Sequence, residues 1–406
     1  MATLTAPASR IEAAEAALAP VWAQLDKTCH HNQKKVLQAF KDHQIGEQHF
    51  AGTTGYGHGD LGREALEAVF AQIMGAETAL VRQQFASGTH ALSVALFGAL
   101  RPGDELLSIA GAPYDTLEEV IGLRGENQGS LMEWGVTYRE LPLTTDGRVD
   151  VAAIPGALRP ETKVVTIQRS RGYDWRPSLR ISEIEAIIRT VKAQRPDIIC
   201  FVDNCYGEFT ETLEPPQVGA DLIAGSLIKN PGGGIVPMGG YVAGREDLVH
   251  RAACRLTAPG IGREGGASLD LNRLLFQGLF LAPHVVSEAL KGATLAARLF
   301  HDLGYPVDPA WDAPRTDIIQ AVKLGSAEKL VALCRGIQEW SPVHAYVRPE
   351  PDVVPGYADN VVMAGGTFIE GSTLELSADG PLREPYVAYL QGGLKVGGQA
   401  VLGRQT

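Results

Sequence analysis

Lys229 stands inside a run of small and apolar residues that reads "AGSLIKNPGGGIVPMGG". A lysine ammonium is strongly hydrated and is rarely placed among apolar residues without a partner or a task. A desolvated lysine has a lowered pKa and can form a Schiff base with an aldehyde. The alternative is a lysine on a surface loop, which the apolar and glycine neighbours make less favourable. The motif therefore predicts an amine held beside a ligand, with Ser226 close by.

A carboxylate follows another apolar segment, in "IICFVDNCYGEF", where Asp203 comes at the end of the apolar run. In open α/β sheets, ligands bind beyond the carboxyl ends of the strands, so an acid at this position can face a cofactor. The alternative is an aspartate that caps the next turn. The pattern alone indicates a site only weakly.

A third motif, "FASGTHALSVALFGAL", places Ser87, Gly88 and Thr89 at the start of an apolar helix. The free amides and the positive dipole end of a helix N-terminus bind phosphate well. An ordinary N-cap is the alternative. The segment lacks the Gly-Lys pair of a Walker loop and the glycine spacing of a dinucleotide fingerprint.

The three motifs together match the needs of one cofactor, pyridoxal 5'-phosphate. This cofactor requires a held phosphate, an acid beside its pyridinium nitrogen and a lysine joined to its aldehyde. The chain offers one candidate for each requirement, and the sequence therefore predicts a pyridoxal-phosphate site.

The composition excludes several other classes of protein. The chain has 406 residues, a formal net charge of -11 and 45% hydrophobic residues. Without a cluster of Lys and Arg, we expect no nucleic-acid partner and no membrane surface as partner. Five cysteines without a C-x-x-C pair indicate neither a disulfide framework nor a metal site. The N-terminus does not resemble a signal peptide, so we expect a cytoplasmic protein.

The spacing of apolar residues predicts the elements that position these motifs. Helical spacing over residues 9–43 gives way to a glycine-rich arm, and from Glu64 onward helices and strands alternate. Several strands are apolar on both faces, as in a mainly parallel sheet covered by helices. We predict N-terminal helices and an arm over 1–62, a large cofactor-binding domain over 63–285, and a smaller α+β domain over 286–406.

The chain resembles the fold-type I pyridoxal-phosphate enzymes, and more closely the methionine gamma-lyase-like or aluminium-resistance proteins, which are relatives of the Cys/Met-metabolism lyases. The resemblance implies an α/β fold with a mainly parallel seven-stranded sheet in the large domain. Its most specific stretches are "TGYGHGDLGREALE", "LVRQQFASGTHALSVALFGALRPGDELL", "QRSRGYDWRPSL", "VDNCYGEF", "GSLIKNPGGGIVPMGGYVAG" and "ELSADGPLREPYVAYLQGGL".

The resemblance also implies roles for individual residues. Lys229 is similar to the Schiff-base lysine, and Asp203 to the partner of the pyridinium nitrogen. Tyr114 is placed like the aromatic residue that stacks on the cofactor ring, although a tyrosine in the core is the alternative. The implied phosphate contacts are Ser87, Gly88, Thr89 and Ser226.

Two regions of the chain resemble parts that complete the site in such lyases. Tyr56 and Arg63, in the glycine-rich arm, resemble residues donated by a neighbouring subunit, Tyr56 to catalysis and substrate binding and Arg63 to the cofactor phosphate. This implies a homotetramer built as a dimer of dimers. Arg383 is placed like the arginine that binds the substrate carboxylate, the alternative being a surface arginine beside Asp379 and Glu384. The usual asparagine near the cofactor's phenolic oxygen is replaced by Gln168, Arg169 or Ser170.

The implied activity is that of a carbon-sulfur lyase acting on a sulfur-containing amino acid. A methionine gamma-lyase-like elimination would yield a 2-oxo acid, ammonia and a thiol. The alternatives are a beta-lyase acting on cystathionine or cysteine, an aminotransferase, and a non-catalytic pyridoxal-phosphate-binding stress protein, because fold does not fix function.

Overall fold

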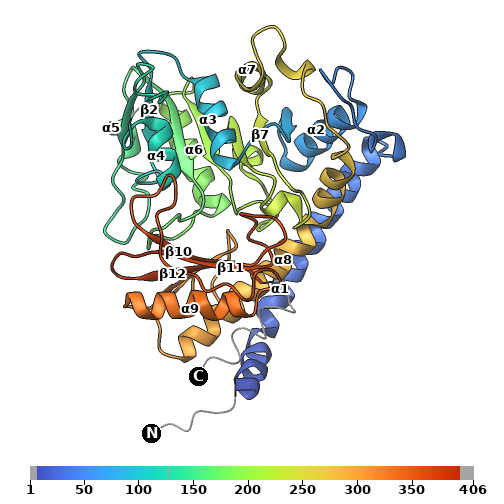
Figure 1. The fold of residues 1–406 in the computed structure, drawn as a ribbon. Helices are drawn as coiled ribbons and strands as arrows, with labels where there is room; N and C mark the ends of the chain where they lie inside the picture. Colours follow the sequence, from blue (N-terminus) through green and yellow to red (C-terminus); the bar gives the residue numbers. More distant parts are fainter. Residues whose placement is uncertain (1–6, 127, 394–406) are drawn as a thin grey trace.

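The structure, a computed structural model, describes residues 7–126 and 128–393. The ends of the first and last predicted domains, 1–6 and 394–406, lie outside this description. Figure 1 shows a large part that contains the first sheet and, below it, a smaller part that contains the second. Within the described ranges, no helix combines the length and apolar character that crossing a membrane requires.

The first sheet has seven strands in the order β1-β7-β6-β5-β4-β2-β3. The neighbours from β6 to β3 pair in parallel, whereas β7 runs antiparallel to both β6 and β1. The predicted seven-stranded, mainly parallel sheet is therefore confirmed. The strands are β1 (Thr78–Arg82), β2 (Glu105–Ser108), β3 (Thr137–Glu140), β4 (Thr162–Gln168), β5 (Ile199–Asp203), β6 (Leu222–Ser226) and β7 (Gly240–Gly244).

Helices cover both faces of this sheet. Successive residues of a strand point to opposite faces. In β5, Cys200 and Val202 join one apolar core, and Ile199 and Phe201 join the other. The first core includes α2 (Leu61–Met74), α6 (Ile181–Gln194) and much of α8 (Asn272–Asp302), and the second includes α3 (Gly88–Ala99), α4 (Asp115–Ile121) and α7 (Glu246–Leu256). Because both faces of β5 are covered, its residues from Ile199 to Val202 are all apolar.

The second sheet has five antiparallel strands in the order β10-β11-β12-β9-β8. Its own apolar core includes α9 (Ala327–Glu339) and the end of α8. The strands are β8 (Val307–Asp308), β9 (Ile319–Lys323), β10 (Val361–Gly365), β11 (Leu376–Pro381) and β12 (Val387–Gly392). This is the predicted smaller α+β part.

Two long helices join the parts. α1 (Pro7–Asp42) and α8 pack against each other and run side by side along the molecule (Figure 1). The predicted domain boundary between residues 285 and 286 falls inside α8, which is one unbroken helix. The remaining short elements are α5 (Ile154–Ala157), η1 (Glu47–His49), η2 (Pro215–Val218), η3 (Asn230–Gly232) and η4 (Gly262–Glu264).

Candidate active site

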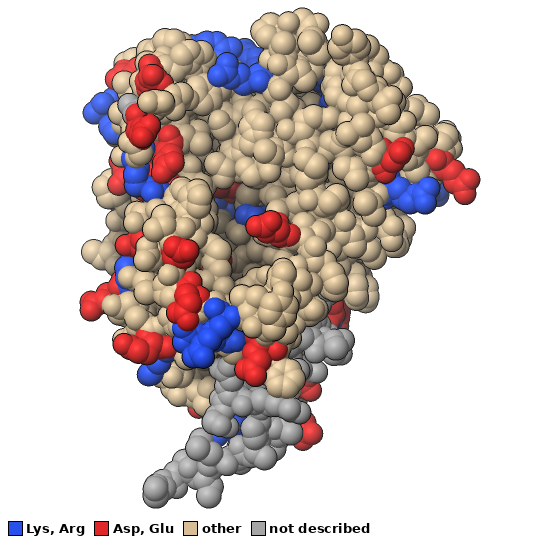
Figure 2. Space-filling view, in the orientation of Figure 1, with Lys and Arg blue, Asp and Glu red and all other residues tan. Residues whose placement is uncertain are grey.

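A cavity of about 640 Å³ lies between the two sheets and is lined by residues of both parts. Figure 2 shows a hollow between the upper and lower parts of the molecule, with a few charged side chains at its mouth. Lys229, Asp203, Ser226 and Tyr114 line the cavity, and so does the start of α3. The structure thus brings together the three sequence motifs that predicted a pyridoxal-phosphate site.

Strand ends explain why these residues meet. Because β4, β5 and β6 are parallel, their carboxyl ends lie at the same edge of the sheet. Gln168 ends β4 directly opposite Asp203, which ends β5, and Ser226 ends β6. All three line the cavity. Of the three residues predicted to replace the usual asparagine, which are Gln168, Arg169 and Ser170, Gln168 is the one that ends a strand at this edge. Ser170 also lines the cavity.

Lys229 follows β6 in the turn before η3 and lies against an aromatic ring. Its Nζ is 3.8 Å from the ring centroid of Tyr206. Tyr206 has a φ of 71°, in the left-handed region that a bulky residue rarely adopts. The amide of Asn230 donates hydrogen bonds to the carbonyl oxygens of Tyr206 (3.0 Å) and Glu208 (3.0 Å), which ties the two turns together. The strained backbone thereby holds the ring against the lysine.

The pKa of Lys229 differs from the value expected from the sequence. Burial lowers it, but the neighbouring Tyr206, Cys205 and Asp203 outweigh burial, and the pKa is raised. The prediction of a lowered pKa is therefore wrong for this structure, because the lysine is buried together with groups that stabilise its ammonium. Lys229 must lose this proton before it can attack an aldehyde.

Asp203 is buried at the end of β5, and its Oδ1 accepts a hydrogen bond from the Cys205 amide (3.1 Å). Burial raises the pKa of its carboxyl, while the Cys205 hydrogen bonds and the charges of Lys229 and Arg176 lower it. A cation held against this carboxylate would stabilise its ionised form. A protonated pyridine nitrogen is such a cation.

The start of α3 forms a cradle with the end of β6. Ser87 is the N-cap, and its hydroxyl accepts a hydrogen bond from the His90 amide (3.1 Å). A Cβ on residue 88 would come within 3.2 Å of the Ser226 Cβ. The glycine therefore keeps the space between the start of α3 and the end of β6 free. The buried Ser226 hydroxyl has no hydrogen-bond partner in the structure. An unpaired hydroxyl beside the free amides of a helix start fits a phosphate group.

Thr89 and Tyr114 complete this side of the cavity. The hydroxyl of Thr89 is 2.9 Å from that of Thr116 in α4. The Tyr114 amide donates to Gln168 Oε1 (2.8 Å), and its phenol lies 2.5 Å from the Tyr357 phenol. Burial raises the pKa of Tyr114 well above its ordinary value, so the phenol stays neutral.

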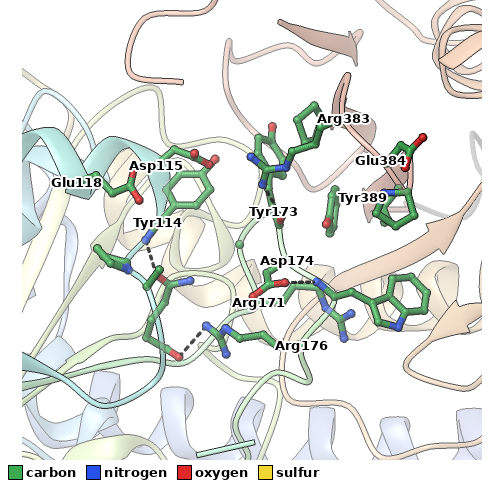
Figure 3. A pocket seen from close by; sticks show the side chains of 18 residues that line it. Tyr114, Asp115, Glu118, Arg171, Tyr173, Asp174, Arg176, Arg383, Glu384 and Tyr389 are labelled. Carbon is green, nitrogen blue, oxygen red and sulfur yellow. Dashed lines mark hydrogen bonds between the residues drawn. The ribbon is translucent and has the colours of Figure 1, made fainter. Parts of the chain in front are cut away.

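Arg383 lies in a second pocket of about 270 Å³, outside the Lys229 cavity (Figure 3). Its guanidinium donates to Asp359 Oδ2 (2.9 Å) and to the Tyr173 carbonyl oxygen (2.9 Å). The second pocket adjoins the first, because Tyr114, Gln168 and Gly172 line both. The structure therefore does not bring Arg383 against Lys229, and its predicted contact with the substrate stays a prediction.

The residues of the glycine-rich arm do not line the cavity of their own chain. Tyr56 is 83% exposed, and so remains accessible to another molecule. Arg63 is buried and donates to the carbonyl oxygens of Gly57 (2.7 Å) and Gly266 (2.7 Å). These two bonds use one terminal nitrogen of Arg63, and its predicted contact with a neighbour's cofactor phosphate stays a prediction.

Several cavity residues received no role from the sequence, although the segments that contain them did. Tyr206 follows Asp203 closely, and Ser377, Asp379 and Gln391 belong to the small sheet. Asp379 could have been suspected, because an aspartate is unusual inside a strand. For Tyr206, only its place just after the strand-end acid was a signal.

Comparison with known proteins identifies the family of the chain. A family model described as methionine gamma-lyase matches residues 8–401. The uncharacterised protein YnbB of Bacillus subtilis is 54% identical over 381 residues, covering 94% of this chain and 90% of that protein. A solved candidate cystathionine beta-lyase involved in aluminium resistance, from Listeria monocytogenes, is 51% identical with a TM-score of 0.94, covering 97% of this chain and 98% of that one.

A solved carbon-sulfur lyase involved in aluminium resistance, from Clostridium novyi, is 49% identical with a TM-score of 0.93, covering 98% of this chain and 94% of that one. Two more distant structures, at 20% and 17% identity, share the fold with TM-scores of 0.56. The predicted fold type is therefore confirmed. Because the family model spans nearly the whole chain and its relatives are similar over almost their full length, the protein belongs to the methionine gamma-lyase family.

Proposed function

We propose that the protein is a pyridoxal-phosphate-dependent carbon-sulfur lyase that acts on a sulfur-containing amino acid. The observation that carries the proposal is the single cavity that joins Lys229, Asp203 and the α3 cradle. Ser87, Gly88, Thr89 and Ser226 would hold the phosphate. Asp203 would face the pyridine nitrogen, Tyr114 the ring, and Lys229 the aldehyde.

The cofactor, when bound, supplies an electron sink for the bond that breaks at the substrate's α-carbon. The protein's own groups then handle the protons. Lys229 accepts the α-proton as a general base. It can then deliver this proton to a carbon further along the substrate's side chain. The neutral phenol of Tyr114, paired with Tyr357, can donate a proton to the departing thiolate. In total, an amino acid and water become a 2-oxo acid, ammonium and a thiol.

The substrate carboxylate, on this proposal, binds in the second pocket beside Tyr114. Figure 3 shows Arg171, Arg176 and Arg383 around this pocket. Arg171 is buried and donates to Asp308 Oδ2 (2.5 Å), but its Nε and Nη1 atoms have no partner in the structure. Arg383 already uses both terminal nitrogens. Arg171 is therefore the stronger candidate for a paired contact with a carboxylate.

Arg171→Ala is expected to weaken amino-acid binding by roughly 2–5 kcal/mol, the range for truncating one partner of a buried charge pair. This corresponds to a KM about 30- to 5,000-fold higher. Arg383→Ala serves as the matched variant and should have a smaller effect. Steady-state kinetics measures KM for both variants, and circular dichroism checks that both are folded. A larger KM effect for Arg383→Ala would return the carboxylate to the residue that the sequence predicted.

We also propose a cytoplasmic homotetramer built as a dimer of dimers. The support is the exposed Tyr56 on its arm, which is available to complete a neighbour's cavity. Light scattering measures the assembly, and full activity in a monomeric form would exclude it.

The proposed reaction is tested by incubating the protein, loaded with pyridoxal phosphate, with methionine, cystathionine or cysteine. Formation of a 2-oxo acid and a thiol without an amino acceptor supports elimination. Formation only with an added acceptor indicates an aminotransferase, and no formation with a bound cofactor indicates a non-catalytic protein. The identity of the 2-oxo acid distinguishes gamma-elimination from beta-elimination. Gamma-elimination of methionine yields 2-oxobutanoate, whereas a beta-lyase yields pyruvate. The relative named as a candidate beta-lyase makes this second measurement necessary.

A further inference from the structure

Two phenol groups meet in the cavity that contains Lys229. The Tyr114 oxygen lies 2.5 Å from the Tyr357 oxygen, and both residues line this cavity. Their rings cross at 83°, with the ring centroids 5.8 Å apart. Tyr114 belongs to the large part, whereas Tyr357 lies in the loop before β10 of the small part. The hydrogen bond between these two phenols therefore joins the two parts inside the cavity.

Contacts on both sides of Tyr357 hold this loop in place. On one side, Arg124 of the large part donates from Nη2 to the carbonyl oxygen of Gly356 (2.8 Å). On the other side, Asp359 accepts a hydrogen bond from Arg383 (2.9 Å). The loop is therefore fastened before and after the phenol. These contacts also give Arg383 a place in the site that requires no contact with the substrate.

The surroundings of the two phenols differ in how well they stabilise a negative charge. Burial raises the pKa of Tyr114 well above its ordinary value, and neighbouring tyrosines raise it further. Burial also raises the pKa of Tyr357, as do Asp379 and Asp115. A hydrogen bond from Tyr114 to the ionised phenol and the charge of Lys229 both lower the pKa of Tyr357. A phenolate is therefore better placed at Tyr357 than at Tyr114.

A thiolate that leaves the substrate needs a proton, and Tyr114 alone would be left as a phenolate in the less favourable of the two places. We propose that Tyr357 is a positioning residue behind Tyr114, and that the two phenols form a proton relay for the departing thiolate. The inference rests on the proposed function and concerns how the leaving group is released. A charge passed along a hydrogen bond is shared by both groups, which lowers the cost of the transfer.

The relay moves two protons. The carbon-sulfur bond breaks with its electron pair on sulfur, the Tyr114 O–H proton passes to sulfur, and the Tyr357 O–H proton passes to the Tyr114 oxygen. Tyr357 is left as a phenolate, stabilised by the new Tyr114 O–H and by the ammonium that Lys229 became when it accepted the α-proton. In a beta-elimination, this ammonium then returns a proton to Tyr357 through water. All three groups regain their starting state, so the step leaves no net charge on the protein.

Two substrates with different leaving groups test the relay on the cofactor-loaded protein. S-methyl-L-cysteine expels methanethiolate, which needs a proton, whereas 3-chloro-L-alanine expels chloride, which does not. Both yield pyruvate and ammonium, and methionine with 2-amino-4-chlorobutanoate forms the corresponding pair for gamma-elimination. In Tyr357→Phe we expect kcat for the sulfur compound to fall about 10- to 100-fold, and kcat for the chloro compound to change less than about threefold. Equal losses for both, or no loss for either, would overturn the inference.

A double variant shows whether the two phenols act as one unit. Tyr114→Phe is expected to reproduce the loss that depends on the leaving group. The double variant Tyr114→Phe/Tyr357→Phe should lose no more than about threefold beyond the larger single loss. Losses that multiply would mean independent roles and would contradict the relay. As a control, Tyr305→Phe alters a tyrosine that packs against Phe300 and lines neither pocket, and it should leave both rates unchanged.

A measurement without substrate separates the relay from the proposed function. NMR of the protein with ¹³Cζ-labelled tyrosine follows each phenol through alkaline pH, and the signal of Tyr357 is the one that Tyr357→Phe lacks. Tyr114→Phe is expected to raise the pKa of Tyr357, because the hydrogen bond that lowers it is lost. An unchanged pKa would rule out the pairing on which the relay depends.

The two proposals fail in different ways. If the unmodified protein releases chloride from the chloro compound but no thiol from any sulfur compound, the proposed function is wrong, and the relay has no thiolate to protonate. If the unmodified protein releases thiol and Tyr357→Phe does so at the same rate, the relay alone is wrong.

Discussion

Replacing Lys229 with alanine is expected to lower the rate of 2-oxo acid formation by about 10²–10⁴-fold, the usual contribution of a positioned general base. The variant loses the amine that lies 3.8 Å from the Tyr206 ring. It also loses the atom to which borohydride should fix the cofactor in the unmodified protein. Oxo acid formation is measured in a coupled assay, and the reduced linkage by mass spectrometry of the peptide.

A matched variant controls for the loss of a lysine as such. Lys34→Ala removes an exposed lysine of α1 that does not line the cavity. We expect normal rates and normal cofactor fixation. Undiminished turnover in a folded Lys229→Ala protein would refute the proposed mechanism.

The second large effect is expected for Asp203→Asn. The amide preserves the shape of the side chain but removes the charge opposite the proposed pyridine nitrogen. We expect a loss of roughly 2–5 kcal/mol of transition-state stabilisation, which corresponds to about 30- to 5,000-fold in rate. Steady-state kinetics measures the loss, and the absorption spectrum reports whether the cofactor is still bound.

A charge-preserving variant makes this prediction specific. Asp203→Glu keeps a carboxylate at the end of β5 and should recover part of the rate. If the asparagine variant turned over at a near-normal rate with its cofactor bound, Asp203 would not be the acid that matters, and the pairing proposed here would be wrong.

Residues that depend on strand order could be predicted from the sequence. Asp203 and Ser226 each end an apolar run of residues. The carboxyl ends of adjacent parallel strands meet at one edge of the sheet, independently of the conformation of the loops. The start of α3 is a local signal of the same kind, because Ser87 caps a helix that begins at Gly88. These features are fixed by the periodicity of the sequence and by the handedness of the fold. The residues at the centre of the site can therefore be predicted from the sequence.

Residues that depend on the packing of distant segments could not be predicted. The sequence around Arg383 does not indicate that its guanidinium forms a hydrogen bond with Asp359. The sequence around Arg63 likewise does not indicate its hydrogen bond to the Gly266 carbonyl oxygen. The short helix α7 was not anticipated, and the raised pKa of Lys229 depends on Tyr206, whose backbone takes a rare conformation. Such facts belong to tertiary contacts rather than to local spacing.

The unbroken course of α8 has a thermodynamic consequence. Phe276 and Leu290 belong to the core of the large part, whereas Ala296 and Phe300 of the same helix belong to the core of the small part. Melting the helix in one core would therefore expose side chains of the other, which couples the two cores into a single cooperative unit. A ligand seated between the sheets raises the free energy of unfolding of both cores together, by an amount that grows with the logarithm of its concentration relative to its dissociation constant.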